Sequence, residues 1–380
     1  MAIDLGGADA LLLLGDSERN TDLYYATRFR APGSFIFLWT SQAKIAVMSD
    51  LELDRAKAQA QVDQVLSHSA FVEALRRQGH EHPANHQVLL AVLGELGLKR
   101  LLVPAEFPFS LADQLRQTGI ELQTGPTPLL PQRQFKTPEE LQAIRRSLHA
   151  AEQGMEAAIE ALRQANVGDD QILHAEGQVL TAQRLRQLIH HRLLDEDCTA
   201  QRTIVACGEQ GCDPHQEGHG PLRANQTLIL DIFPQSALSG YFGDITRTVV
   251  KGRAPEPVRR LYETVQRGQQ LALEQIRAGA EGNQIHQGVQ DYFTAQGYAT
   301  GEQDGQLQGF FHSTGHGLGL DIHESPRIGP RSPALQAGQV VTVEPGLYYR
   351  GLGAVRLEDV VLVKEDGCEL LTTYPKFLEV

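Results

Sequence analysis

The chain has 380 residues, a formal net charge of -13 at pH 7 and a hydrophobic fraction of 41%. This length and apolar content suffice for one large or two ordinary globular domains with real cores. Because nucleic-acid affinity rests on Lys and Arg side chains that neutralise phosphates, the acidic balance argues against a nucleic-acid partner. The first residues lack a positively charged start, and no apolar run of about 18 residues follows. We therefore expect a soluble, cytoplasmic protein without a membrane segment.

The four cysteines, at positions 198, 207, 212 and 368, have neither metal-binding nor redox spacing. Free cysteines commonly behave as small hydrophobic residues. We expect unpaired thiols.

From residue 11 to about 123, short β-type runs alternate with amphipathic stretches such as "LELDRAKAQAQVDQVL" and "SLADQLRQTG". This alternation is typical of an α/β domain. Residues 124–140, "TGPTPLLPQRQFKTPEE", contain four prolines and no apolar periodicity, which indicates a linker whose last four residues begin a helix. We expect an N-terminal domain over 1–135 and a second domain over 136–380.

The second domain contains an internal repeat. "AIEALR" at 158–163 recurs as "ALEQIR" at 272–277, an offset of about 114 residues. At nearly the same offset, "TLILD" ending in Asp231 matches "VVTVE" ending in Glu344, and "GDITRTVV" around Asp244 matches "RLEDVVLV" around Glu358. The sequence therefore predicts two similar halves, each with long helices and a β-hairpin that carries two acids.

The four acids Asp231, Asp244, Glu344 and Glu358 interrupt or end strand-like apolar runs. An isolated ionised carboxylate is costly to bury there. Two hairpins related by a pseudo-twofold axis would bring all four acids together, and such a cluster requires cations. Two divalent ions would balance the four negative charges.

His316 is the natural fifth ligand of this site, because the flanking Gly315 and Gly317 allow close approach of the backbone. Carboxylates with one imidazole suit Mn²⁺, Co²⁺, Fe²⁺ or Zn²⁺. His323 follows seven positions later, and in a continuous strand this odd spacing would turn it to the opposite face. One histidine would then bind metal and the other would face a substrate.

The segments "GHGLGLDIHESP", "VEPG", "VRLED" and "GYFGDITRT" together resemble the M24 metallopeptidases of the pita-bread fold, which include methionine aminopeptidase, aminopeptidase P and prolidase. "ERNTDLYYATRF" extends the resemblance to the creatinase-type N-terminal domain of the proline-specific members. The resemblance implies an α+β pita-bread catalytic domain with an internal repeat, preceded by an α/β creatinase-like domain. It also implies hydrolysis of Xaa-Pro bonds by a metallo-exopeptidase and a homodimeric assembly.

The resemblance also implies a dinuclear centre, for which manganese is the first expectation and cobalt, zinc or iron are alternatives. Asp244 and Glu358 would bridge both ions, Asp231 would complete one ion, and His316 with Glu344 would complete the other. Two such ions activate a water and polarise the scissile carbonyl.

Four further roles follow from the motif positions. Glu344 would act as general base, and His323 would stabilise the oxyanion or the leaving group. His215 in "GEQGCDPH" would bind the substrate at the scissile bond, with His219 as a neighbouring alternative. His312 would line the proline pocket.

Arg356 would also contact substrate, or it would instead pair with a ligand acid.

Two departures from the family pattern are visible. Asp231 is followed by "IFP" instead of x-Gly, and thirteen positions instead of eleven lead to Asp244. No motif identifies the group that binds a substrate carboxylate, although Arg28, Arg30 and Arg350 are available. The sequence therefore leaves the choice between dipeptidase and aminopeptidase open.

Two other functions on the same fold remain as alternatives. One is a creatinase-like hydrolase of a small amidine, which works without metal. The other is a non-catalytic binding protein, a change normally marked by loss of ligands.

Overall fold

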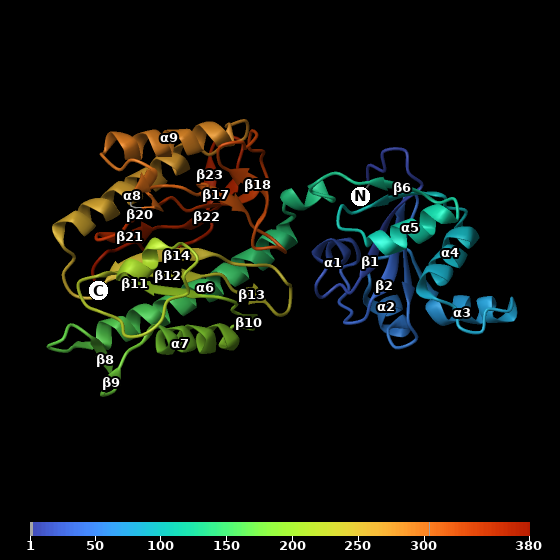
Figure 1. Cartoon of the computed structure of the whole chain (residues 1–380), viewed down its shortest axis with the longest axis horizontal. Helices are drawn as coiled ribbons and strands as arrows, with labels where there is room; N and C mark the ends of the chain where they lie inside the picture. The colour runs from blue at the N-terminus through green and yellow to red at the C-terminus, as the bar shows by residue number, and fades with distance from the viewer. Residues whose placement is uncertain (1–2, 304) are drawn as a thin grey trace. The chain divides into compact units, whose positions relative to one another are not determined.

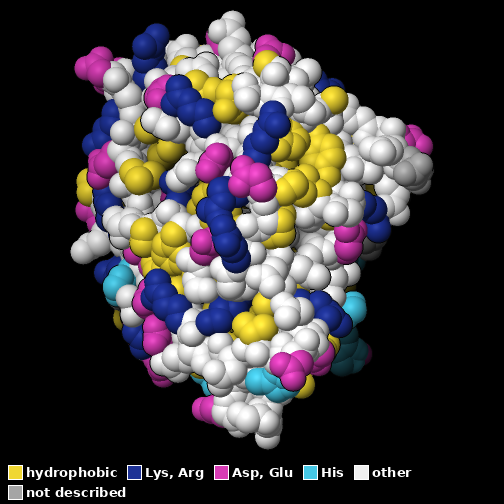
Figure 2. All heavy atoms as spheres, turned by 90° about the vertical axis from the view of Figure 1, so that its left-hand side faces the viewer, with side chains coloured by type: hydrophobic (Ala, Val, Ile, Leu, Met, Phe, Trp, Pro, Cys, Tyr) yellow, Lys and Arg dark blue, Asp and Glu magenta, His cyan; other side chains and the backbone are white. Residues whose placement is uncertain are grey.

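The computed structural model in Figure 1 describes residues 3–303 and 305–380. The chain divides into two compact units, Met1–Pro131 and Gln132–Val380, and each has its own hydrophobic core. None of the helices in the described residues is long and apolar enough to span a membrane. On the face in Figure 2, basic and acidic side chains lie interspersed among small apolar areas.

Unit 1 is built on a six-stranded mixed sheet with the order β4-β3-β2-β1-β5-β6. The central β1 pairs antiparallel with β2 and parallel with β5, so the expected alternation of strands and helices forms one sheet with helical connections. The elements are β1 (Ala10–Gly15), α1 (Thr21–Thr27), β2 (Phe35–Thr40), β3 (Lys44–Met48), α2 (Leu53–Gln59), β4 (Gln64–Ser67), α3 (His68–Arg77), α4 (Asn85–Leu96), β5 (Arg100–Val103), α5 (Phe109–Gln117) and β6 (Glu121–Thr124).

The amphipathic stretch 51–66 forms two elements. The helix α2 ends at Gln59, and Gln64 to Ser67 form β4. Val65 and Leu66 pair in parallel with Ala46 and Val47 of β3, and this pairing extends the sheet by one strand. Tertiary pairing thus replaces the helical periodicity of the last three residues of the stretch.

The first half of unit 2 begins with η1 and the long helix α6, whose start matches the prediction from "TPEE". Thr137 caps the helix, Pro138 is its first residue, and the Glu140 carboxylate accepts the Thr137 backbone N–H. The elements are η1 (Pro131–Gln134), α6 (Pro138–Gln164), β7 (Asn166–Val167), β8 (Leu173–Ala175), β9 (Gln178–Val179), α7 (Ala182–Asp195), β10 (Cys198–Thr199), β11 (Ile204–Cys207), η2 (Gly208–Cys212), β12 (Thr227–Ile232), β13 (Gln235–Ser236) and β14 (Ile245–Val250).

The second half of unit 2 repeats the plan of two helices followed by a hairpin of two long strands. The sheet β18-β17-β19-β22-β23 contains this hairpin, as β11-β12-β14 does in the first half. The elements are α8 (Glu256–Gln275), α9 (Gly282–Ala295), β15 (Gly301–Gln303), β16 (Gln306–Gln308), β17 (Gly315–Gly317), β18 (Glu324–Ile328), β19 (Val340–Val343), β20 (Gly346–Tyr349), β21 (Gly353–Arg356), β22 (Asp359–Val363) and β23 (Cys368–Leu370).

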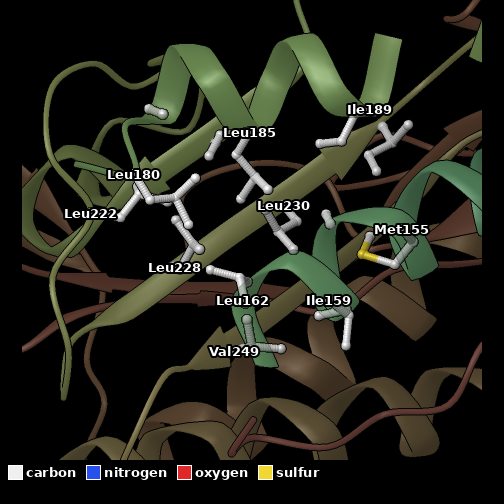
Figure 3. Close-up of a cluster of buried hydrophobic side chains, with 14 of the residues drawn as sticks. Met155, Ile159, Leu162, Leu180, Leu185, Ile189, Leu222, Leu228, Leu230 and Val249 are labelled. Carbon is white, nitrogen blue, oxygen red and sulfur yellow. The ribbon is translucent and has the colours of Figure 1, made fainter. Parts of the chain in front are cut away.

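The core of the first half lies between its helices and its hairpin (Figure 3). Met155 and Ile159 of α6 and Ile189 of α7 pack in the same cluster as Leu230 of β12 and Val249 of β14. The second half has the corresponding core between α8, α9 and its own sheet. Each half therefore buries one face of its hairpin against helices and leaves the other face for the site.

Candidate metal centre

The first hairpin carries Asp231 near the end of β12 and Asp244 just before β14. Successive side chains of a strand point to opposite faces. Leu228 and Leu230 point into the helical core (Figure 3), so Asp231 points to the other face. On β14, Val249 enters the same core, and Asp244 lies on the opposite face by the same alternation.

The second hairpin carries Glu344 just after β19 and Glu358 just before β22. Val341 and Val343 pack in the core of the second half, so Thr342 and Glu344 lie on the opposite face. The pairing of Val343 with Asp359 brings the ends of the two strands together. Both acids of this hairpin are thereby placed at one edge of the sheet.

His316 is the middle residue of β17, which pairs with β18 and β19. A Cβ atom at Gly315 would overlap the Thr342 carbonyl, and one at Gly317 would overlap the Ser325 carbonyl. Only glycine therefore allows the neighbouring strands to approach this closely. The two flanking glycines hold His316 deep in the sheet, next to the acids.

The donor atoms from both hairpins and from β17 converge. His316 Nε2 lies 3.3 Å from Glu344 Oε1 and 3.9 Å from Asp244 Oδ2. Ligand atoms of Asp244, His316 and Glu358 all lie within 4.8 Å of one another. Four of the five predicted ligands thus share one small volume.

The hydrogen bond of His316 leaves its outer nitrogen available for a metal. Nδ1 lies 3.1 Å from the Gly317 carbonyl, which can only accept, so Nδ1 carries the proton. Burial and the nearby His323 lower the pKa of His316 to about 3, so the ring is neutral at pH 7. Its Nε2 lone pair points toward the carboxylates, as in a metal-binding histidine.

The acids raise one another's pKa. Burial, followed by the charge of Asp231, raises the pKa of Glu358 to about 8. Burial and the nearby Glu358 raise the pKa of Asp244 and of Glu344 well above their ordinary values. Such a cluster strongly favours a bound cation that would replace the protons.

Asp231, the fifth predicted ligand, is held by one oxygen. Its Oδ2 accepts a hydrogen bond from Arg356 Nη2 at 2.7 Å. Its Oδ1 is buried and accepts no hydrogen bond from the residues that the structure describes. A buried carboxylate oxygen without a donor suits a metal ligand.

Arg356 belongs to a chain of hydrogen bonds that ends at His312. Arg356 Nη1 donates to Tyr348 Oη at 3.0 Å, and Tyr348 Oη lies 2.9 Å from His312 Nε2. His312 Nδ1 donates to the Ser313 carbonyl at 2.8 Å, so Nε2 is the acceptor for the tyrosine O–H. Burial and the charge of Arg356 lower the pKa of His312 to about 3, consistent with a neutral ring.

His323 differs from its predicted placement. Residues 318–323 form a turn instead of a strand, and the rings of His316 and His323 lie 4.3 Å apart, edge to face. The expectation that the two histidines face opposite sides was wrong, because the continuous strand on which it depended does not form. Burial, with a contribution from Arg327, lowers the pKa of His323.

His215 lies in an exposed segment after η2, where its backbone N–H donates to Asp213 Oδ1 at 3.0 Å. Its charge contributes to the lowered pKa of both His312 and His323, so it lies near these rings. The alternative His219 is tied through its backbone to Gln210.

Three hydroxyl side chains support the site but were missed in the sequence. Thr246 Oγ1 donates to Glu358 Oε2 at 2.8 Å, and Thr342 Oγ1 accepts the His316 backbone N–H at 3.1 Å. Tyr348 is the third. A signal existed for the two threonines, since Thr246 and Thr342 each stand two positions from a predicted ligand and so share its face.

The long connection between Asp231 and Asp244 packs against α6. Tyr241 Oη donates to Glu140 Oε1 at 2.6 Å, and Ser147 Oγ donates to the Tyr241 carbonyl at 2.9 Å. A Cβ at Gly243 would overlap the Ser147 backbone, so only glycine fits there. The tip departs from the family pattern but keeps both acids in place.

These residues fit a divalent metal centre. Four carboxylates supply hard oxygen donors, and the neutral imidazole supplies one borderline nitrogen. The buried Asp231 Oδ1 accepts no hydrogen bond from the described residues and could bind a cation. Arg356 pairs with Asp231 and offsets one of the four carboxylate charges. Two halves, each with a layer of two helices and a hairpin that carries two acids, thus meet at a candidate metal site.

The chain belongs to metallopeptidase family M24, whose model matches residues 142–365. This match includes all five predicted ligands. Metallopeptidases of this family use divalent metal, so the comparison agrees with the chemistry of the donor set.

Individual relatives were found by sequence and by structure. The chain is 37% identical over 183 residues to an uncharacterized peptidase of Bacillus subtilis, covering 48% of this chain and 49% of that protein. It is 31% identical over 240 residues to an Xaa-Pro dipeptidase of Pyrococcus furiosus, covering 63% of each. These matched stretches thus span about half to two thirds of the relatives' length.

A solved structure shows the same fold over nearly the whole chain. The X-Pro aminopeptidase from Thermotoga maritima superposes with a TM-score of 0.80 at 23% identity, covering 98% of both chains. The predicted fold class, a pita-bread domain with an internal repeat preceded by an α/β domain, is confirmed.

Proposed function

We propose that the chain is a metal-dependent exopeptidase that hydrolyses the bond between an N-terminal residue and a following proline. The observation that carries the proposal is the convergence of Asp244, Glu344 and Glu358 from the two hairpins with the neutral His316. The resemblance of the chain to proteins named Xaa-Pro dipeptidase and X-Pro aminopeptidase supports the substrate class.

Five side chains would hold the ions: Asp231, Asp244, His316, Glu344 and Glu358. Bound divalent ions supply Lewis acidity toward a carbonyl oxygen and acidify water. Manganese is the first candidate, with cobalt, zinc or iron as alternatives, because oxygen donors with a single imidazole suit these ions.

Glu344 would accept the proton of the attacking water. Its side chain is 18% exposed, compared with 13% for Asp231 and 6% for Asp244, so it is the most open of these three acids.

His323 would stabilise the developing oxyanion or the leaving group from its place against the His316 ring. His215 would bind the substrate beside the scissile bond. Its exposed position near His323 and His312 supports this role.

His312 would line the proline pocket. Both ring nitrogens are occupied, by the Ser313 carbonyl and by Tyr348. The remaining surface of the ring is apolar and stands among the rings of Phe310 and Phe311. Such a wall suits the pyrrolidine ring of proline, which offers no N–H.

Arg356 would act on substrate through Asp231 and Tyr348. Nη1 donates to Tyr348 and Nη2 donates to Asp231, and the arginine is only 4% exposed. The contact supports the reading in which Arg356 pairs with a ligand acid.

We also propose a two-domain organisation over 1–135 and 136–380, a homodimer and a cytoplasmic location. The resemblance to the family supports the domains and the dimer. The four free cysteines support a reducing compartment.

The test is an assay of the chelated protein with Ala-Pro and Ala-Pro-Ala, each with and without added Mn²⁺. We expect no hydrolysis after chelation and recovery with Mn²⁺ or Co²⁺. Preference for Ala-Pro would indicate a dipeptidase, and preference for Ala-Pro-Ala an aminopeptidase. Turnover that persists without metal would contradict the proposal and favour the creatinase-like alternative, and no turnover with any ion would favour a binding protein.

A further inference from the structure

The turn that carries His323 is held by a buried ion-pair cluster at its end. Lys136 Nζ donates to Glu324 Oε1, and Arg133 Nη2 lies 2.8 Å from Glu324 Oε2. The same Arg133 nitrogen lies 2.7 Å from Asp321 Oδ2, inside the turn. The two cations come from the segment that precedes α6, and they lie 188 and 191 positions away from Glu324 in the chain.

Glu324 and its two cationic partners are unusually buried for charged groups, whereas the side chain of Asp321 is 44% exposed. The side chain of Lys136 is 2% exposed, that of Glu324 10% and that of Arg133 11%. Lys136 Nζ also donates to the Arg133 carbonyl, so the lysine fixes the segment that carries both cations.

The other side of the turn is held by backbone contacts. The Phe242 N–H donates to the Gly319 carbonyl at 2.8 Å, and the Gly319 N–H donates to the Asp321 carbonyl at 3.2 Å. A Cβ at Gly319 would overlap the Glu324 carboxylate, so glycine lets that carboxylate fold back over the turn. The residues before His323 are therefore clamped between the Asp231–Asp244 connection and the cluster.

A buried ion pair adds little net stability, because desolvation cancels most of the attraction. The charges instead fix the orientation of the Glu324 carboxylate, because Arg133 and Lys136 bind its two separate oxygens. Glu324 directly follows His323, so holding Glu324 in place restricts the backbone from which the His323 ring extends.

We propose that Glu324, Lys136 and Arg133 are positioning residues that fix His323 against His316. The ion pairs of Glu324 are with Lys136 and Arg133, so the cluster acts on His323 through the backbone of the turn. The kinetic part of this inference rests on the proposed function, whereas the structural part concerns the turn alone.

The experiment compares the full-length wild type with three variants of the cluster and one control variant. Glu324→Asp keeps the charge and shortens its reach, and Lys136→Met with Glu324→Gln removes both charges so that no unpaired buried charge remains. Lys136→Arg keeps the cation as a conservative rescue. Lys364→Met, which removes a half-exposed lysine paired with Glu369, is the matched control.

Two readouts are measured for each protein. Hydrogen exchange of peptides that cover 318–326 reports the turn without any need for activity, and steady-state kinetics on Xaa-Pro substrates with Mn²⁺ reports the site. In Glu324→Asp and in the double variant we expect exchange of the turn to become faster, and kcat to become lower, by roughly 10-fold or more. The reason is that small misplacements of a positioned group are costly. KM should stay within about 2-fold of the wild-type value. Lys136→Arg, which keeps the cation, should retain most of the wild-type kcat.

An unchanged kcat in Glu324→Asp, or wild-type exchange in the double variant, would overturn the inference. An equal loss in Lys364→Met would also overturn it, because the effect would then be a general one. If the wild type itself fails to cleave Xaa-Pro substrates, the proposed function fails, and the exchange of the turn still decides whether the cluster holds it.

Discussion

The two halves of unit 2 supply the same parts to the site but in unequal amounts. Each half contributes a helix-backed hairpin with two acids, Asp231 with Asp244 and Glu344 with Glu358. Each half also has a third strand beside its hairpin, β11 in the first half and β17 in the second. Only β17 carries a donor, His316, and only the segment after β17 carries His323. The repeat thus provides two acids from each half, whereas β17 and the segment after it add the two histidines that the first half lacks at the equivalent place.

The strongest test of this comparison is the removal of one acid from each half at equivalent positions. Asp244→Asn and Glu358→Gln should each lower kcat/KM by roughly 10³-fold or more, because loss of the ions removes several kcal/mol of transition-state stabilisation. The two losses should be similar if the positions are equivalent. Metal content by mass spectrometry and kinetics of the same preparations measure both effects. A variant that keeps two ions and normal rate would remove its residue from the centre.

The other equivalent pair should break the symmetry. Glu344→Gln should retain metal and lower kcat by about 10²-fold or more, because a general base is lost. Asp231→Asn should mainly weaken binding of one ion, so that its activity recovers at high Mn²⁺ concentration. Calorimetric titration with Mn²⁺, alongside kcat at saturating metal, separates the two outcomes. Equal recovery of both variants would show that the halves play the same role.

The smallest effect concerns stability without metal. The usual pKa of a glutamate is 4.5, and that of Glu358 is raised to about 8, so the folded apoprotein holds a proton that the unfolded chain releases. The contribution of Glu358 to the stability of the apoprotein is therefore fully present below pH 4.5 and is lost as the pH rises toward 8. We expect EDTA to lower the Tm more at pH 8 than at pH 5, as measured by calorimetry. An EDTA effect that is the same at both pH values would contradict the proton-for-metal exchange.

The sequence was sufficient for the fold class and for bringing the five donors into one hypothesis. Acids that interrupt apolar strands and recur at a fixed offset indicate a shared site, even when only one sequence is considered. The structure adds the geometry, with the His316 ring next to Glu344 and Asp244.

The sequence was insufficient where the answer depends on distant partners. His323 was assigned to a strand from local pattern, but Glu324 meets Lys136 far along the chain, and the segment before it forms a turn. Tyr348 likewise acquires its role only through Arg356 and His312, which come from other strands and loops. Local periodicity carries no information on such contacts.

The glycines beside His316 have a consequence for how this chain tolerates change. Position 315 is restricted by the Thr342 carbonyl, and position 317 by the Ser325 carbonyl. Neither restriction involves a metal or a substrate. A lineage that lost its catalytic ligands would therefore still be compelled to keep both glycines, so these residues record the architecture of the sheet and are no evidence of activity.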